Sequence, residues 1–124
     1  MAKSVHDNVL DGAFNILNDG DIMTACNAEP TTRTQAVTTY ALADVAMTPG
    51  TDYTIADDAV SPYGRKCTMA AKNGVNVDVS GDAIYIAICD ATRLLYVTTC
   101  TLQTLTSGNT VNFPAWKVQI GDPT

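Results

Sequence analysis

The sequence predicts a mainly β protein, a single antiparallel β-sandwich or barrel-like domain with one α-helix at its N-terminus. The first observation behind this prediction is that polarity comes from eighteen threonines, whereas Glu29 is the only glutamate. Such β-branched residues favour strands over helices. The second is the stretch 74–100, which holds three strand-like apolar runs separated by short breaks. Short connections between consecutive strands are typical of an antiparallel meander.

The three runs differ in the number of faces that they are expected to bury. In the first, 75–79, valines alternate with polar residues, which predicts a strand with one buried face. The second, 84–89, is apolar on both faces and predicts a strand in the interior of a sheet. The third, 94–100, continues into the threonine-rich segment 101–106, which is able to extend the sheet edge.

One amphipathic helix is predicted to open the chain. Apolar residues recur at steps of three and four within 9–17, and Ser4 followed by Asp7 resembles a capping box. We expect this helix to depend on docking against the sheet or a partner subunit, because short helices are marginal alone. The chain is therefore divided into a helix at 1–20 and an antiparallel β domain at 21–124.

A hairpin is predicted between the alternating run 65–71 and the run 75–79. A three-residue loop, 72–74, with Gly74 in the left-handed conformation, keeps one face of both strands apolar. A two-residue turn would pair the valines with a mixed set of residues. The three-residue loop is therefore the predicted connection.

The remaining segments give weaker patterns. Residues 21–27 alternate and predict the first strand, whereas 33–46 is mixed and fits either a short turn or a loop that crosses the sheet. Near the C-terminus, 116–120 predicts a strand. Pro114 has no N–H to donate, so we expect it at an edge or a bulge, with the strand beginning after it.

Composition argues against nucleic acid and membrane partners. The formal net charge is −6 with only seven Lys and Arg, which leaves no basic surface for DNA or RNA. The sequence shows neither an apolar run long enough to span a membrane nor a basic region leading into an apolar segment. We expect a soluble protein made in a cytoplasm.

The sequence predicts no catalytic site, no metal site and no cofactor. His6 is the only histidine, and no serine or cysteine lies in a nucleophile motif. Carboxylate pairs such as Asp57-Asp58 are explained by turn chemistry, since no calcium loop follows them. The four cysteines lack C-x-x-C spacing, so we expect reduced, buried thiols, with a cross-sheet disulfide of Cys26 as the alternative. They are Cys26, Cys67, Cys89 and Cys100.

Several stretches resemble small proteins encoded among the virion structural genes of tailed bacteriophages. They are CNAEPTTRTQAVTTYALADV (26–45), LLYVTTCTLQTLTSGNTVNFPAWKVQIGDPT (94–124) and the opening MAKSVHDNVLDGAFNIL. The resemblance implies a structural role in the particle and no enzyme activity. Its first expectation is a capsid decoration, or cement, protein, made in the host cytoplasm, that binds the major capsid protein on the outside of the head.

The resemblance leaves other roles open. A neck, tail or fibre-associated component would have the same composition, and a module that binds the host surface is a further alternative. The family context also implies contact with other copies of the chain, with a trimer as one arrangement because icosahedral shells have local three-fold sites.

Two apolar pieces flank the predicted meander and are expected to contact other copies or the shell. One is the opening helix and the other is the segment 113–120. A small basic spot next to the predicted hairpin is either a solvated strand end or a contact with an acidic neighbour. The interface residues predicted from these features are Val9, Ala13, Leu17, Phe113, Trp116, Arg65 and Lys66.

Overall fold

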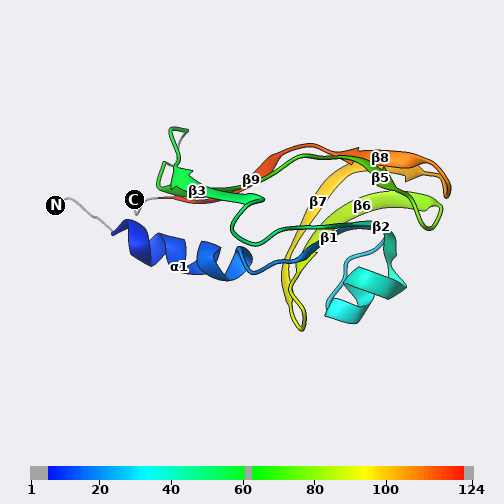
Figure 1. Ribbon diagram of the computed structural model, residues 1–124, viewed down its shortest axis with the longest axis horizontal. Helices are drawn as coiled ribbons and strands as arrows, with labels where there is room; N and C mark the ends of the chain where they lie inside the picture. The colour runs from blue at the N-terminus through cyan, green and yellow to red at the C-terminus, as the bar shows by residue number, and fades with distance from the viewer. Residues whose placement is uncertain (1–5, 61–62, 122–124) are drawn as a thin grey trace.

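The computed structural model of the protein describes residues 6–60 and 63–121, and in these the predicted fold class is confirmed. The chain is mainly β and antiparallel, with one α-helix near the N-terminus (Figure 1). The elements are α1 (Asp7–Leu17), β1 (Ile22–Cys26), the π-helical turn η1 (Gln35–Thr39), β2 (Ala41–Ala46), β3 (Tyr53–Asp57), β4 (Arg65–Met69), β5 (Lys72–Asn76), β6 (Gly81–Cys89), β7 (Leu94–Leu105), β8 (Thr110–Phe113) and β9 (Trp116–Ile120).

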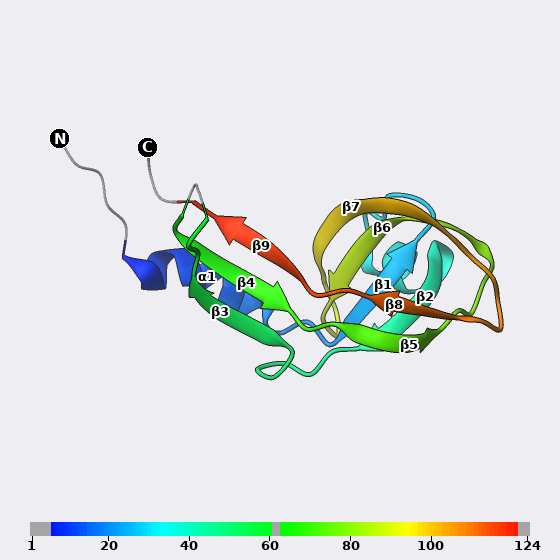
Figure 2. The same ribbon diagram turned by 90° about the horizontal axis from the view of Figure 1, so that it is seen from above.

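The strands form three sheets, arranged at two ends of an elongated molecule (Figures 1 and 2). At one end, which we call the sandwich end, the four-stranded sheet β2-β1-β6-β7 is accompanied by the pair β5-β8. At the other, the helix end, α1 packs against the sheet β3-β4-β9. The strand β6 lies between β1 and β7, which confirms the prediction of an interior strand.

The opening helix begins later than the capping pattern suggests. His6 is its N-cap, and its Nδ1 accepts a hydrogen bond from the backbone N–H of Asn8 at 3.1 Å. Ser4, the predicted cap, lies outside the described residues. The helix buries one apolar face, as expected for an amphipathic helix that depends on docking. The buried residues are Leu10, Phe14 and Leu17.

The predicted hairpin between 65–71 and 75–79 is wrong. Instead, β4 continues into β5, and the two strands pair with β9 and β8 respectively. Gly74 does have a positive φ of 66°, but it sits in a bulge of β5, where the register with β8 shifts. Its N–H donates to the Asn112 side chain at 2.9 Å. The alternating pattern of 75–79 fits any partner strand, so it did not select the correct one.

The predicted three-strand meander is therefore right only for its last two strands. β6 and β7 form an antiparallel hairpin across Asp90, whose N–H donates to the carbonyl of Arg93 at 3.0 Å. β5 does not pair with β6, and Gly81-Asp82, the break between the first two apolar runs, begins β6. The mixed segment 33–46 forms η1 and then β2, which pairs with β1.

A long two-stranded ribbon joins the two ends of the molecule (Figure 2). Its β4–β9 part ends at the pair Met69–Trp116, and its β5–β8 part begins at the pair Lys72–Phe113. Pro114 lies between the two parts, where its missing N–H interrupts the ladder, as predicted. The buried residues form one main cluster that includes side chains from both ends, among them Phe14, Met69 and Val75.

Candidate interaction surface

The two sides of the sandwich end differ in backbone pairing. On the side of β2 and β5, the carbonyl of Leu42 accepts the N–H groups of Asp78 at 2.8 Å and Val79 at 3.1 Å. A further bridge links Ala43 with Val77. We call this the closed side. It joins the four-stranded sheet to the β5–β8 pair through the chain's own hydrogen bonds.

The opposite side, between β7 and β8, has no such pairing in the described part of the chain. The turn between them is tight, with the N–H of Asn109 donating to the carbonyl of Thr106 at 3.0 Å. Nevertheless, the two strands diverge beyond 8 Å between Cα atoms along nearly their whole length. We call the gap between β7 and the β8–β9 strand, from Thr98 to Leu105 on one side and from Val111 to Trp116 on the other, the open seam.

Two apolar hollows of about 260 and 210 Å³ lie along the open seam. They share Ile86, Cys100, Phe113 and Pro114, and no charged residue of the described chain lines either of them. A more polar hollow of about 440 Å³ continues from Gln103 towards the turn. The open seam is therefore an uncharged slot that leads towards the core of the sandwich.

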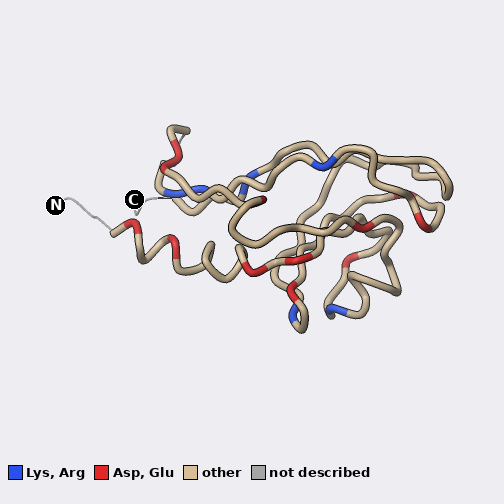
Figure 3. The backbone as a smooth tube through the Cα atoms, in the orientation of Figure 1, with Lys and Arg blue, Asp and Glu red and all other residues tan. Residues whose placement is uncertain are grey.

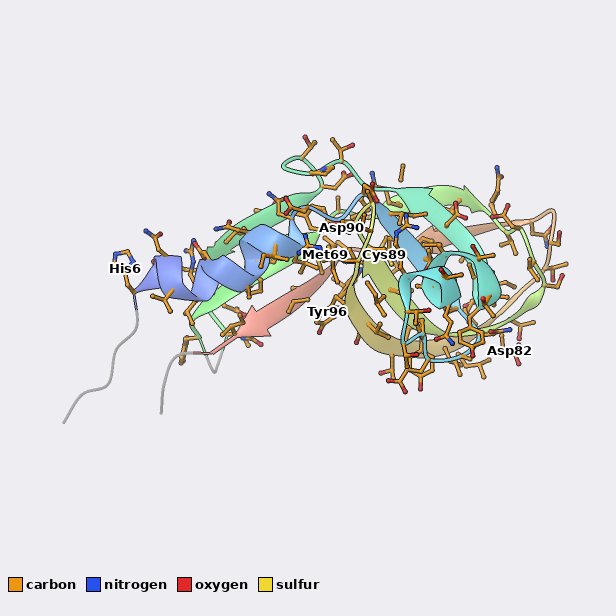
Figure 4. All side chains as sticks on the ribbon, turned by 90° about the horizontal axis from the view of Figure 1, so that it is seen from below. His6, Met69, Asp82, Cys89, Asp90 and Tyr96 are labelled. Atoms are coloured by element: carbon orange, nitrogen blue, oxygen red, sulfur yellow. The ribbon has the colours of Figure 1, made fainter. Side chains whose placement is uncertain are left out.

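An aromatic pair lies at the end of the open seam that is nearer the helix. The rings of Tyr96 and Trp116 have centroids 5.9 Å apart, and Figure 4 shows Tyr96 where the two ends of the molecule meet. The indole Nε1 of Trp116 is buried and has no hydrogen-bond acceptor among the described residues. Leaving a buried donor unpaired costs about 1–3 kcal/mol, so an acceptor at this position would be favourable.

A third apolar hollow, the helix groove, is lined in part by Tyr96. It has a volume of about 250 Å³ and is bounded by α1, β7 and β9. Next to it, Val9 and Ile16 on α1 are 69% and 50% exposed. Together with Ala13, they repeat at steps of four and three and therefore share one face of the helix. The groove residues used below are Ala13, Ile16, Leu95, Val118 and Ile120.

The predicted interface residues differ in how far they are exposed. Val9 and Ala13 are exposed on α1, whereas Leu17 and Phe113 are buried and belong to the core. Trp116 is partly buried and lines the open seam. The sequence prediction did not select Ile16, although its spacing from Val9 and Ala13 was the signal for it.

The predicted basic spot is largely matched by carboxylates of the same chain. Arg65 donates from Nε to Asp11 at 2.9 Å and from Nη1 to Asp57 at 2.8 Å. These bonds, the one to Asp11 first, hold the pKa of Arg65 above its ordinary value. Figure 3 shows this basic segment of β4 beside acidic positions on α1. Lys66 is partly buried on the same strand.

Other cations are paired in the same way. Lys72 lies 2.8 Å from Asp52, and Lys117 lies 3.1 Å from Asp58. The pKa of Asp52 is held below its ordinary value first by Lys72 and then by the N–H of Thr48. Because these positive charges are neutralised within the chain, the formal net charge of −6 is carried by the other carboxylates.

All four cysteines are free, as predicted, and three of them are buried. Burial raises the pKa of the Cys67 and Cys89 thiols to about 11. Cys100 is only partly buried and lines both apolar hollows of the open seam. It is therefore the thiol best placed to report on what covers the seam.

Neither a metal-binding cluster nor a membrane-spanning helix is present in the described part of the chain. Among the described residues, no group of three or more His, Cys, Asp or Glu side chains is arranged to hold a metal ion. Within the same ranges, none of the helices has the length and apolar character needed to cross a membrane. Comparisons with family models, curated proteins and solved structures find no match to this chain.

Proposed function

We propose that the protein is a structural component of a tailed-phage particle, a decoration protein that binds the major capsid protein on the outside of the head. The resemblance to virion structural proteins supplies the biological context. The observation that carries the proposal is the apolar surface formed by the helix groove and the adjoining Val9 and Ile16. This surface is where the protein contacts the capsid lattice.

The continuity of this surface is the reason to assign it a partner. Single exposed hydrophobic residues are ordinary on a soluble protein. Here Ile16 is both 50% exposed and part of the groove wall, so the exposed helix face runs directly into the hollow. Exposed apolar surface that is contiguous in this way is typical of protein interaction sites.

A lattice partner suits a surface of this modest size. Covering apolar area contributes roughly 25 cal/mol per Å², from which the cost of association is deducted. One such contact is weak alone. Many copies on one shell, or several copies joined to each other, add their contacts and stabilise the particle through multivalency.

The location of the protein is tested by its copy number in purified particles. A decoration protein follows the symmetry of the shell and is expected on the order of hundreds of copies per particle. A neck or tail component would be present in about a dozen copies or fewer. Absence from purified particles contradicts both roles.

The surface is tested by placing a charge on the exposed face of α1. Ile16→Lys is expected to lower occupancy on particles at least tenfold, equivalent to about 1.4 kcal/mol, because the ammonium group would be covered without a partner. Asn15→Lys adds the same charge at a neighbouring exposed polar position and is expected to leave occupancy unchanged. Equal occupancy for both variants would rule out the helix face as the contact.

A further inference from the structure

Two unpaired strand edges face each other across the open seam. β7 is the last strand of its sheet, and β8 pairs only with β5 among the described strands. Inserting one strand between them requires about 9 to 10 Å, which is twice the usual strand spacing. β7 and β8 lie more than 8 Å apart along most of their length, so they do not pair with each other and their edges are left open.

The edge of β7 carries only one of the usual protections against pairing with another chain. Natural edge strands are commonly short or bulged, or carry lysine, proline or an inward-pointing charge. β7 has a bulge between Thr99 and Gln103, where its register with β6 shifts. β7 has twelve residues, Leu94–Leu105, and none of them is charged or a proline. An edge of this kind is a template for an added strand.

We propose that the open seam receives an extended segment of the particle protein that this chain decorates, which adds a β-strand between β7 and β8. The inference rests on the proposed function and names how the partner is held. The segment hydrogen-bonds to β7 along one edge and to β8 along the other. It thereby gives the open side the pairing that the closed side obtains from its own chain.

The chemistry of the seam defines the segment. Because the two apolar hollows have no charged lining, the segment is uncharged over the length that it inserts. Its alternate side chains point inwards towards Ile86 and Phe113 and are apolar.

A folded second copy of this chain is a poorer occupant. Each of its described strands is already paired along at least one edge, so none is free to pair along both. A copy could place its own β7 against β7, but β8 would then remain uncovered. The two-edged slot therefore favours an extended segment of a different protein over self-association through the sheet edge.

The first measurement uses Cys100 as a reporter in the full chain, free in solution and bound to particles. Iodoacetamide is expected to modify Cys100 in the free protein and to modify it at least about tenfold more slowly on particles, where the inserted strand covers it. Cys67 and Cys89 are buried and serve as internal controls. Equal modification of Cys100 in both states would overturn the inference.

The second measurement identifies the occupant. A photo-crosslinking residue, p-benzoylphenylalanine, replaces Thr101, which lines the seam, or Leu102, its 57% exposed neighbour that does not. On irradiated particles, adducts at position 101 are expected to map to one short segment of another particle protein. Adducts at position 102 are not expected to map to that segment. Adducts at 101 that map to residues 94–105 of a second copy would overturn the inference.

A pair of charge variants tests whether the seam is needed for binding. Thr101→Arg places a charge in the uncharged slot and is expected to lower particle occupancy at least about tenfold. Leu102→Arg places the same charge on the same strand, outside the slot, and is expected to keep occupancy within about twofold. Similar occupancy for the two variants would overturn the inference.

The outcomes separate this inference from the proposed function. If the unmodified chain is absent from particles, the proposed function fails and the inference falls with it. If the chain is present and Ile16→Lys removes it, while Cys100 reacts as in the free protein, the helix surface stands and only the seam inference fails.

Discussion

The closed and open sides of the sandwich differ in whether the four-stranded sheet is hydrogen-bonded to the β5–β8 pair. On the closed side, the chain continues past β5 and donates two N–H groups to Leu42, so the two sheets are joined. On the open side, the tight turn at Thr106–Asn109 brings β7 and β8 together, but each strand already pairs elsewhere. A short connection between two strands therefore does not by itself make a hairpin.

The largest difference between the two sides is expected from truncating a leucine on each. Leu42 is 1% exposed on the closed side, so Leu42→Ala should lower the free energy of unfolding by about 2–5 kcal/mol. Leu102 is exposed on β7, and Leu102→Ala should change the free energy of unfolding by no more than about 0.5 kcal/mol. Urea denaturation measures both. Comparable losses would show that the two sides are equally packed.

An intermediate effect is expected from the ion pair at the start of β5. The Asp52 pKa is depressed, so its contribution to stability is present above the unfolded value of about 3.9 and is lost as pH falls through the folded value. Asp52→Asn should lower the free energy of unfolding at pH 7 by about 1 kcal/mol. Once the pH lies below the depressed pKa of folded Asp52, the variant and the parent should converge. A pH-independent difference would contradict an electrostatic role.

The smallest effect, of opposite sign, is expected from the carboxylates of the closed side. Partial desolvation of the carboxyl group, and then the nearby Asp78, raise the pKa of Asp44. A raised pKa means that ionised Asp44 disfavours folding at neutral pH, and this cost disappears below the unfolded pKa. Asp44→Asn should therefore stabilise the protein at pH 7 by about 0.5 kcal/mol or less, because Asp44 is exposed and screened.

Thermal melts of Asp44→Asn at pH 7 and pH 3 measure this effect. Glu29→Gln removes an exposed carboxylate away from Asp78 and provides the matched control. Stabilisation by both substitutions alike would point to net charge rather than to the closed side. A loss of stability in Asp44→Asn would show that its carboxylate is favourably paired.

Local features of the fold were predictable because they depend on neighbouring residues. The apolar run 84–89 has no exposed residue, as expected for an interior strand, and Pro114 interrupts any ladder. The helix followed from its spacing, which also selected Val9 and Ala13. The same spacing selected Leu17, which is buried and also lines the helix groove.

Strand partners were not predictable, because the same alternation suits several partners. Gly74 was correctly placed at positive φ, yet a bulge and a hairpin loop both use that conformation. The open seam was missed for the same reason. Ser107-Gly108-Asn109 predicts a turn, and nothing in these residues shows that β8 pairs with β5 instead of β7.

The long ribbon has a consequence for cooperativity. Because β4 continues into β5 and β8 into β9, two strands of the helix end run directly into two strands of the sandwich end. The main buried cluster also extends through both ends. We therefore expect the molecule to denature in a single all-or-none transition.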